Sequence, residues 1–366
     1  MRARKLVAAF GAVALTASLV ACSSGDDSSS ADAESSVAEE TVAEESAAEE
    51  VTEEAAEVTE EAAESEDQAV EKIAFFGFWK TNSFTKAVLD GVQQAADEIG
   101  AEVIDLSPAD YDAAAQIKAV QDQTIKGDAQ VYVMLASDSV GMATAAQEAI
   151  DAGIAVVAAF TPLGPDFTTL EPQVPGLLVV GETPVGNGAV LAQMAADACA
   201  DLNPCNVAYL EGLKALPLDN ARTEAFVSTL ASSNPNAVLV AQVEGGYAPD
   251  SGKKAAQDAL QANPDINVMV GSSQAIIGAS EVVDTSKVAL IGNGASCEAF
   301  EAVAAGEWYG LYNLDTVGMG KQSTENAVEL ANGGSPTPAF DSQTLRDPKG
   351  TADVIAGFEC AYSDLG

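Results

Sequence analysis

The side chains that could act chemically on a substrate are limited in kind, because the 366 residues include no histidine. This absence removes serine–histidine and cysteine–histidine catalysis, imidazole acid–base chemistry and most zinc sites. Carboxylates are abundant, with 56 Asp and Glu, but no pair stands apart from the generally acidic composition. The residue types therefore favour binding over catalysis, with no metal and no cofactor. A secreted hydrolase that uses carboxylates alone is the alternative.

The five cysteines divide into one near the N-terminus and four in the rest of the chain. An even number in an exported protein predicts two disulfides, for which three connectivities are possible. We favour Cys199–Cys205 together with Cys297–Cys360, because the first pair is close enough to join the end of a helix to the next strand. A metal site is not favoured, since no Cys-x-x-Cys spacing accompanies them.

The fifth cysteine, Cys22, follows a segment typical of export. A positively charged start is followed by the apolar run 6–20, which is shorter than the about 20 residues that a spanning helix needs. Leu19-Val20-Ala21-Cys22 resembles the lipobox of bacterial lipoproteins. Residues 1–21 are thus expected to be a signal peptide, with lipid on Cys22 anchoring the protein to the outer face of the cell membrane or its periplasmic side. An ordinary signal peptide with a chance cysteine is the alternative.

Residues 22–71 are expected to form a disordered acidic stalk behind the lipid. Nineteen acidic residues and no basic ones lie between Ser23 and Glu71, and Val-Thr-Glu-Glu-Ala-Ala-Glu occurs twice, at 51–57 and 58–64. Such a segment cannot bury enough apolar surface to offset chain entropy, and glutamates four residues apart repel in a helix. We interpret it as a tether, with an interaction tail as the alternative. The remaining 72–366 still carry a net charge of −24, which argues against nucleic-acid binding.

Residues 72–366 alternate short apolar runs with helical patterns, which predicts an α/β fold with parallel sheets. Ser83 is the expected N-cap of the first helix. After a Pro- and Gly-rich connection at 161–176 the pattern restarts, which indicates two doubly wound domains joined near residue 181. Strands are expected at 73–78, 103–106, 131–136, 154–160, 177–180, 206–210, 238–243, 268–271 and 288–291, and helices at 84–99, 113–126, 139–152, 188–201, 221–232, 252–262 and 276–283.

In doubly wound sheets, ligands bind beyond the carboxyl ends of the strands. The loops that follow these strand ends are therefore the place to look for a site. They come after residues 78, 136, 160, 210, 243, 271 and 291.

Several motifs in this region match one family at matching spacings. The densest are Ile73-Ala-Phe-Phe, Thr81-Asn-Ser-Phe84 and Asp90-Gly91-Val-Gln-Gln-Ala-Ala-Asp-Glu-Ile-Gly100, with looser matches at 121–127, 149–157, 222–226 and 263–265. Residues 72–366 thus resemble the ribose-type periplasmic binding proteins, the sugar-binding components of ABC importers. The resemblance implies a type I periplasmic-binding-protein architecture, with two Rossmann-like domains joined by a three-segment hinge.

The resemblance also implies the activity. We expect a non-enzymatic, monomeric receptor that closes around a small solute, a sugar or sugar-like compound, and delivers it to an ABC permease. A solute-sensing receptor of the same fold that feeds a signalling system is an alternative. Sugar-responsive repressors share the fold, but a signal peptide and a stalk occupy the place of their DNA-reading headpiece.

Family binding residues can be carried over to matching positions. The resemblance implies that Asn82 binds sugar hydroxyls, that Phe84 packs on a sugar face and that Arg222 clamps the solute. It also aligns Tyr247 with a stacking aromatic and Asn313 with a polar residue at a hinge crossing. Simpler interpretations make Asn82 a turn residue, Phe84 a core residue and Arg222 a surface partner of Glu224.

This chain departs from the family where sugar binders carry charged groups. Phe160-Thr161 replaces an Asp-Arg pair, and Asn293-Gly294 stands where an Asp is expected. Ser272 replaces a ligand-binding Asn. Phe160, Ser272 and Asn293 are expected to contact the solute at these positions. Trp79 adds an aromatic ring at the same mouth, unless it is simply an exposed loop residue. An aromatic-rich, charge-poor cleft suits a solute less polar than ribose, or a sugar held by stacking and amides.

The family topology places three chain crossings near 181, 313 and 339. The first domain is then expected to comprise 72–181 plus 314–338, and the second 182–313 plus 339–366. Both expected disulfides fall within the second domain and leave the hinge free to move.

Overall fold

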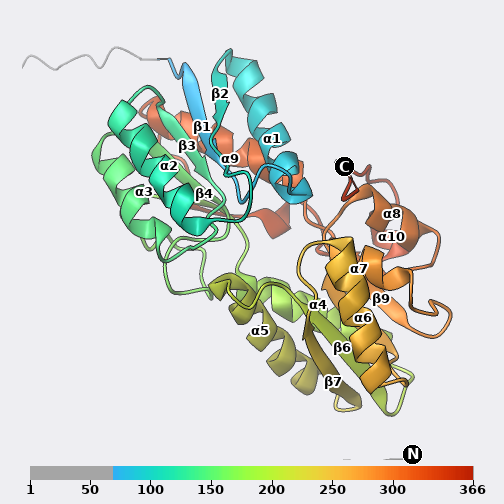
Figure 1. The fold of residues 1–366 in the computed structure, drawn as a ribbon. Coiled ribbons are helices and arrows are strands. Elements are labelled where there is room, and N and C mark those ends of the chain that lie inside the picture. The colour runs from blue at the N-terminus through green and yellow to red at the C-terminus, as the bar shows by residue number, and fades with distance from the viewer. Residues whose placement is uncertain (1–68, 366) are drawn as a thin grey trace, which may run out of the picture. The chain divides into compact units, whose positions relative to one another are not determined.

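The computed structural model describes residues 69–365, which contain two six-stranded sheets covered by helices (Figure 1). The first sheet has the strand order β11-β5-β4-β3-β1-β2 and is entirely parallel. The second has the order β12-β10-β9-β8-β6-β7, and only the β10–β12 pair is antiparallel. The predicted α/β class is confirmed. The signal peptide, Cys22 and the stalk up to residue 68 lie outside the described residues.

The first sheet is built mainly from the first half of the described chain. Its elements are β1 (Lys72–Phe76), α1 (Ser83–Ile99), β2 (Glu102–Asp105), α2 (Ala113–Lys126), β3 (Val131–Met134), α3 (Met142–Asp151), β4 (Ala155–Phe160) and β5 (Leu178–Gly181). The N-cap of α1 is Asn82 and not Ser83, because the Asn82 side chain accepts a hydrogen bond from the Thr85 amide. Gly100 ends α1 in the left-handed conformation, with φ of 75°.

The strands of the second sheet and the helices that cover it come next in the chain. Its elements are α4 (Pro184–Ala198), β6 (Cys205–Glu211), α5 (Pro217–Ser233), β7 (Ala237–Glu244), α6 (Pro249–Ala262), β8 (Val268–Ser272), α7 (Ser273–Ser280), β9 (Ala289–Asn293), α8 (Cys297–Ala304) and β10 (Gly310–Tyr312). Helices α4, α5 and α6 begin three or four residues earlier than predicted. Each starts at a proline, whose fixed φ suits the first helical position and whose missing N–H would be unpaired there anyway.

The last elements return to both sheets. Helix α9 (Thr316–Ala331) packs on α1, and β11 (Ala339–Asp341) joins the edge of the first sheet beside β5. A short 3₁₀ turn (Ser342–Thr344) leads to β12 (Lys349–Gly350) on the second sheet and to α10 (Ala352–Ile355). We call the first sheet with α1, α2, α3 and α9 the first lobe, and the second sheet with α4 to α8 and α10 the second lobe.

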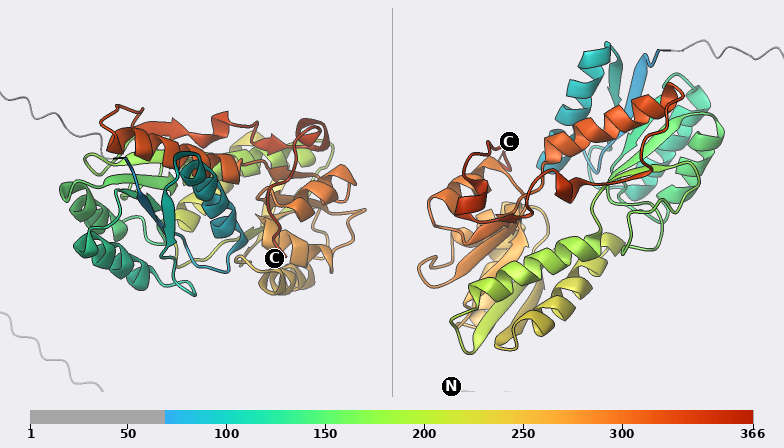
Figure 2. Two further views of the ribbon diagram at one scale, coloured as in Figure 1. Left: turned by 90° about the horizontal axis from the view of Figure 1, so that it is seen from above. Right: turned by 180° about the vertical axis from the view of Figure 1, so that it is seen from behind.

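Both faces of each sheet are buried, as parallel sheets require (Figures 1 and 2). In β1, Ile73 and Phe75 pack with residues of α1 and α9, whereas Ala74 and Phe76 pack with residues of α2 and α3. Helices α1 and α9 approach closely at Gly91, where an added Cβ would lie 2.0 Å from a backbone oxygen of α9. This close packing joins the returning helix α9 firmly to the first lobe.

The chain passes between the lobes three times, after β5, after β10 and after β11. The third passage lies between Asp341 and Lys349, because residues 339–341 pair with β5 in the first sheet. The sequence had assigned those residues to the second domain. Val70, within the expected stalk, is buried in the core of the first lobe.

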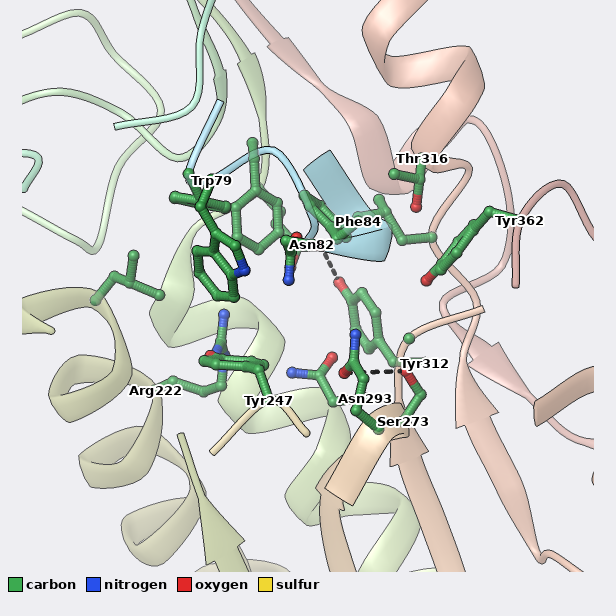
Figure 3. A pocket seen from close by; sticks show the side chains of 17 residues that line it. Trp79, Asn82, Phe84, Arg222, Tyr247, Ser273, Asn293, Tyr312, Thr316 and Tyr362 are labelled. Atoms are coloured by element: carbon green, nitrogen blue, oxygen red, sulfur yellow. Dashed lines mark hydrogen bonds between the residues drawn. The ribbon is translucent and has the colours of Figure 1, made fainter. Parts of the chain in front are cut away.

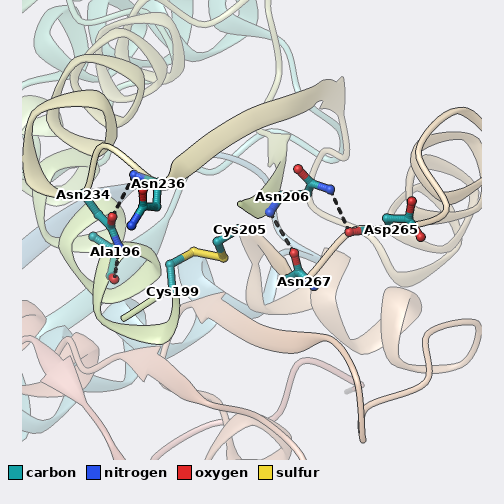
Figure 4. The surroundings of a disulfide bond; sticks show 8 residues. All are labelled: Ala196, Cys199, Cys205, Asn206, Asn234, Asn236, Asp265 and Asn267. Atoms are coloured by element: carbon teal, nitrogen blue, oxygen red, sulfur yellow. Dashed lines mark hydrogen bonds between the residues drawn. A yellow bond between two sulfur atoms is a disulfide. The ribbon is translucent and has the colours of Figure 1, made fainter. Parts of the chain in front are cut away.

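Two disulfides join the cysteine pairs that the sequence favoured, and both lie in the second lobe. Cys199 ends α4 and bonds to Cys205 at the start of β6 (Figure 4). Cys297 begins α8 and bonds to Cys360 in the segment after α10. No helix between residues 69 and 365 is long and apolar enough to cross a membrane.

Candidate functional site

A pocket lies where the loops after the strands of both lobes converge (Figure 3). Two of its residues, Glu182 and Leu314, belong to the passages between the lobes, Thr316 begins α9, and Tyr362 belongs to the segment after α10. The complete lining is Phe78, Trp79, Asn82, Phe84, Phe160, Glu182, Leu218, Arg222, Tyr247, Ser273, Gln274, Asn293, Gly294, Tyr312, Leu314, Thr316 and Tyr362.

The first lobe contributes an aromatic wall made of Phe78, Trp79, Phe84 and Phe160. Phe84 and Phe160 meet edge to face with ring centroids 4.8 Å apart, and Phe78 lies 6.4 Å from each of them. Rings in this arrangement bury a large apolar area and present faces and edges to a neighbour. The wall can therefore pack against the C–H groups of a ring-shaped solute.

Phe160 reaches this wall through an uncommon backbone conformation. Its φ is 74°, and it is the only non-glycine residue between 69 and 365 with a positive φ. The Glu182 amide donates to the Phe160 carbonyl, and a Cβ on Gly181 would lie 2.1 Å from that oxygen. Glycine at 181 thus lets β5 approach the end of β4. Backbone strain of this kind is concentrated at functional sites.

Asn82 caps a helix and also lines the pocket. Its Oδ1 accepts from the Thr85 amide at 2.8 Å, which caps α1, and its side chain also lines the pocket. The side-chain nitrogen of Asn82 points into the pocket (Figure 3). The cap fixes the amide orientation, so the donor is held in place before any solute arrives.

The second lobe contributes a buried polar cluster, Arg222, Asp219 and Tyr247. The Arg222 Nη1 donates to Asp219 Oδ1 at 2.6 Å and to the Tyr247 hydroxyl at 3.1 Å. That hydroxyl in turn donates to Asp219 Oδ1 at 2.6 Å. Burial raises the pKa of Tyr247 well above its ordinary value, so the phenol keeps the proton that it donates. Arg222 is the sixth residue of α5, because this helix begins at Pro217 and not at residue 221 as predicted.

The partner of Arg222 is thus Asp219 on the same helix and not Glu224. Both members of the pair are nearly inaccessible, with side-chain exposures of 4% and 2%. The other oxygen of Asp219 accepts from the Leu213 amide at 2.8 Å, which holds the carboxylate in place. Arg222 Nε has no hydrogen-bond partner within the described chain. The cluster therefore presents a fixed guanidinium whose charge is compensated by Asp219 and whose Nε donor is still unused.

Glu182 is a buried carboxyl at the first passage between the lobes. The Tyr312 hydroxyl donates to its Oε2, while Oε1 has no partner within residues 69–365. Burial raises the pKa of Glu182 to about 7, although the Tyr312 hydrogen bond acts in the opposite direction. The pocket thus contains a carboxyl that changes charge near neutral pH. No sequence pattern distinguished it from the other acidic residues.

Asn293 lies at the end of β9 and lines the pocket. Its amide exchanges two hydrogen bonds with Asn187 of α4, at 3.1 and 3.2 Å. This reciprocal pair uses one donor and one acceptor of each amide and leaves the others available. Asn293 therefore adds a neutral polar group where the family carries an Asp.

Two predicted residues do not line the pocket. Ser272 uses its hydroxyl to cap α7, accepting from the Ala275 amide and donating to the Gly246 carbonyl. Asn313 is buried at the second passage, where its amide donates to the Asp347 carbonyl. Both side chains hold the backbone around the pocket. The other predicted residues, Trp79, Asn82, Phe84, Phe160, Arg222, Tyr247 and Asn293, all line it.

Several lining residues were not anticipated from the sequence. Leu218 is the second residue of α5, and Ser273 and Gln274 begin α7. Tyr312 ends β10, and Tyr362 arrives from the segment after α10. The start of α5 could have been placed from Pro217, but the position of Tyr362 depends on how that segment folds back.

Residues 73–335 match the family described as the periplasmic binding protein domain. No curated protein gives a significant match. Three similar solved structures are an ABC transporter periplasmic solute binding protein from Actinobacillus succinogenes with bound D-allose, a Caulobacter myo-inositol binding protein with its ligand, and an ABC transporter solute binding protein from Mycobacterium smegmatis with bound glycerol.

These structures share the fold at low sequence identity. The Actinobacillus protein is 18% identical, with 79% of this chain and 100% of that chain covered and a TM-score of 0.68. The Caulobacter protein is 20% identical, covers 75% and 91%, and has a TM-score of 0.65. The Mycobacterium protein is 22% identical, covers 80% and 99%, and has a TM-score of 0.66.

Proposed function

Because the chain belongs to the periplasmic binding protein family of non-catalytic solute-binding proteins, we propose that it is the solute-binding component of an ABC importer. The observation that carries this proposal is a single pocket lined from both lobes, with Trp79 and Asn82 on one side and Arg222 and Tyr247 on the other. A solute that contacts all four would draw the lobes together. Solute capture and presentation to a permease follow from that movement.

The solute that suits this pocket is a small sugar or cyclic polyol. The aromatic wall offers ring faces for C–H groups, and Asn82, Asn293 and the Arg222–Asp219–Tyr247 cluster offer directional hydrogen bonds. Three related folds bind D-allose, myo-inositol and glycerol, all of them polyhydroxyl compounds. The aromatic wall and the neutral amides suit a sugar that is held by ring stacking and amide hydrogen bonds.

A thermal-shift screen followed by calorimetry tests this assignment. The screen contains D-allose, myo-inositol, glycerol and further monosaccharides and polyols, with amino acids as a chemically distinct group. We expect a sugar or polyol to raise the melting temperature and to bind with one-to-one stoichiometry. Binding only to compounds outside the polyhydroxyl class would contradict the proposed solute.

A matched pair of variants locates the binding. Tyr247→Phe keeps the ring in the pocket but removes the hydroxyl that joins Arg222 and Asp219. Tyr309→Phe makes the same chemical change at a partly exposed position away from the pocket. In this proposal the solute also bonds to the Tyr247 hydroxyl. Loss of one buried charge-assisted hydrogen bond costs about 1.5–3 kcal/mol, so Tyr247→Phe should weaken binding about tenfold or more. Tyr309→Phe should bind as the parent does.

We further propose that lipid on Cys22 anchors the protein outside the membrane. The proposal is supported by the Leu-Val-Ala-Cys motif directly behind the apolar run 6–20. Cys22→Ser should leave the protein unprocessed or release it to the medium. Processed Cys22→Ser protein that stays in the membrane fraction would exclude Cys22 as the anchor.

A further inference from the structure

The segment after α10 folds back across the second lobe and is held there at several points. Cys360 bonds to Cys297, the first residue of α8, and the Cys297 amide donates to the Tyr362 carbonyl at 2.8 Å. The Glu298 carboxylate accepts from the Ser363 hydroxyl and, at 2.9 Å, from the Asp364 amide. Residues 360–364 are thus attached to the start of α8 by one covalent bond and three hydrogen bonds.

This attachment brings two side chains to the pocket and its edge. Tyr362 lines the pocket, and its hydroxyl accepts from the Ala295 amide at 3.2 Å (Figure 3). One carboxylate oxygen of Asp364 is fully buried and has no hydrogen-bond partner in the described structure. Burying a carboxylate is unfavourable unless specific partners compensate for the lost water. The partners of the other oxygen are therefore informative.

Those partners come from both lobes. Asp364 Oδ1 accepts from the Ser83 hydroxyl at 2.6 Å and from the Gln274 side chain at 2.9 Å. Gln274 Nε2 also donates to the Ser83 hydroxyl oxygen at 3.0 Å. Ser83 is the first residue of α1 in the first lobe, whereas Gln274 belongs to α7 in the second. The Ser83 hydroxyl donates one hydrogen bond to Asp364 and accepts one from Gln274, so both of its hydrogen bonds in this cluster join the first lobe to the second.

We propose that residues Cys360–Asp364 form a strap that joins the two lobes beside the pocket, with Asp364 as the bridging group and the Cys297–Cys360 disulfide as its attachment to the second lobe. The strap acts in addition to the three chain passages and independently of which solute is bound. It stabilises the arrangement in which both lobes line the pocket. Its physical basis is a charge-assisted hydrogen bond shielded from water.

Spin-label distance measurements test the strap without any solute. One label is placed at Ile125→Cys on α2 of the first lobe and one at Lys254→Cys on α6 of the second, both at highly exposed side chains. The full chain carries Cys22→Ser so that the labels occupy the only free thiols. Ser83→Ala and Asp364→Ala are compared with the parent, and Leu365→Ala serves as an adjacent exposed control.

We expect Ser83→Ala and Asp364→Ala each to lower the ratio of the short-distance to the long-distance population about tenfold, the usual effect of losing a charge-assisted hydrogen bond. The double variant should resemble the stronger single variant, because both changes remove the same bridge. Leu365→Ala should match the parent. Parent-like distances in Ser83→Ala and in Asp364→Ala would overturn the proposal, whether or not a sugar is found to bind.

The Cys297–Cys360 disulfide provides a second, independent test of the strap. Replacing Cys297 and Cys360 together with alanine should shift the distances in the same direction, whereas replacing Cys199 and Cys205 should not, since that bridge lies away from the strap. Circular dichroism checks that each variant is folded. If the Cys297–Cys360 variant does not fold, Ser83→Ala decides the outcome alone. Equal effects of the two disulfide replacements would contradict the role of the strap.

Discussion

Glu182 gives the sharpest prediction about stability, because its carboxyl is buried in the pocket beside a passage between the lobes. It is 1% exposed, and only the Tyr312 hydroxyl donates to it within the described chain. Its pKa is raised by burial from 4.5 to about 7. Substitution by glutamine keeps the shape and an oxygen acceptor for Tyr312 but removes the ionisation.

The sign of the effect follows from the two pKa values. Between pH 4.5 and 7 the folded protein retains a proton on Glu182 that the unfolded chain has lost. The contribution of Glu182 to the free energy of unfolding therefore falls as the pH rises through this range and levels off above 7. At about 1.4 kcal/mol for each pKa unit, the whole fall is about 3 kcal/mol. Glu182→Gln cannot show this fall, so its advantage over the parent should grow by about 3 kcal/mol between pH 4.5 and 8.

Urea denaturation at several pH values between 4.5 and 8 measures this directly. Glu301→Gln, at an exposed carboxylate on α8, is the matched control and should differ from the parent by a small amount. The decisive quantity is the difference in unfolding free energy between Glu182→Gln and the parent at each pH. A difference that stays constant over this range would refute the assignment of a neutral, buried carboxyl at position 182.

Three further predictions concern the pocket and the disulfides. Asn82→Asp should retain the cap on α1, and with it a stability within about 0.5 kcal/mol, while losing the amide donor and at least about tenfold in calorimetrically measured affinity. Arg222→Ala should lower the unfolding free energy by about 3–5 kcal/mol in chemical denaturation, because it leaves Asp219 buried and unpaired. Replacing the 297–360 bridge by alanines should lower the free energy of unfolding by about 4 kcal/mol, and replacing the 199–205 bridge should lower it by about 2 kcal/mol. The two bridges close loops of 63 and 6 residues, and the bridge that closes the longer loop removes more entropy from the unfolded chain. Equal losses would contradict the loop-length account.

Arg222 contributes to the fold as well as to the pocket. The clamp role implied by the sequence would make Arg222→Ala weaken binding and leave the empty protein as stable as the parent. The scarcity of basic residues drew attention to this arginine, but only the folded chain shows it buried against Asp219 and Tyr247. A substitution there is expected to affect folding and binding together. Asn82→Asp is consequently the cleaner test of the pocket.

Hydrophobic periodicity in the sequence determined the α/β class, the order of strands and helices from β1 to β9, and the restart of the pattern after β4. It did not predict the helices and strands after β9. Buried parallel strands require continuous apolar runs, and those runs are visible without a structure. The predicted strand ends also located four pocket residues, because ligands of parallel sheets bind at the loops that follow the strands. These residues are Trp79, Asn82, Phe160 and Tyr247. Cysteine spacing likewise indicated the pairs that the structure joins.

Tertiary structure alone decided which side chains meet. Glu182 is one acidic residue among 56 in the sequence, and its raised pKa exists only because the folded chain surrounds it. Ser272 looked like a solute ligand, yet its hydroxyl is used to cap α7. Tyr362 and Asp364 reach the pocket region through a folded-back segment, and Asp364 bonds to Ser83 across 281 positions of the chain. Periodicity reports which face of an element is buried, whereas contacts between distant segments depend on the packing of whole elements, which local patterns do not encode.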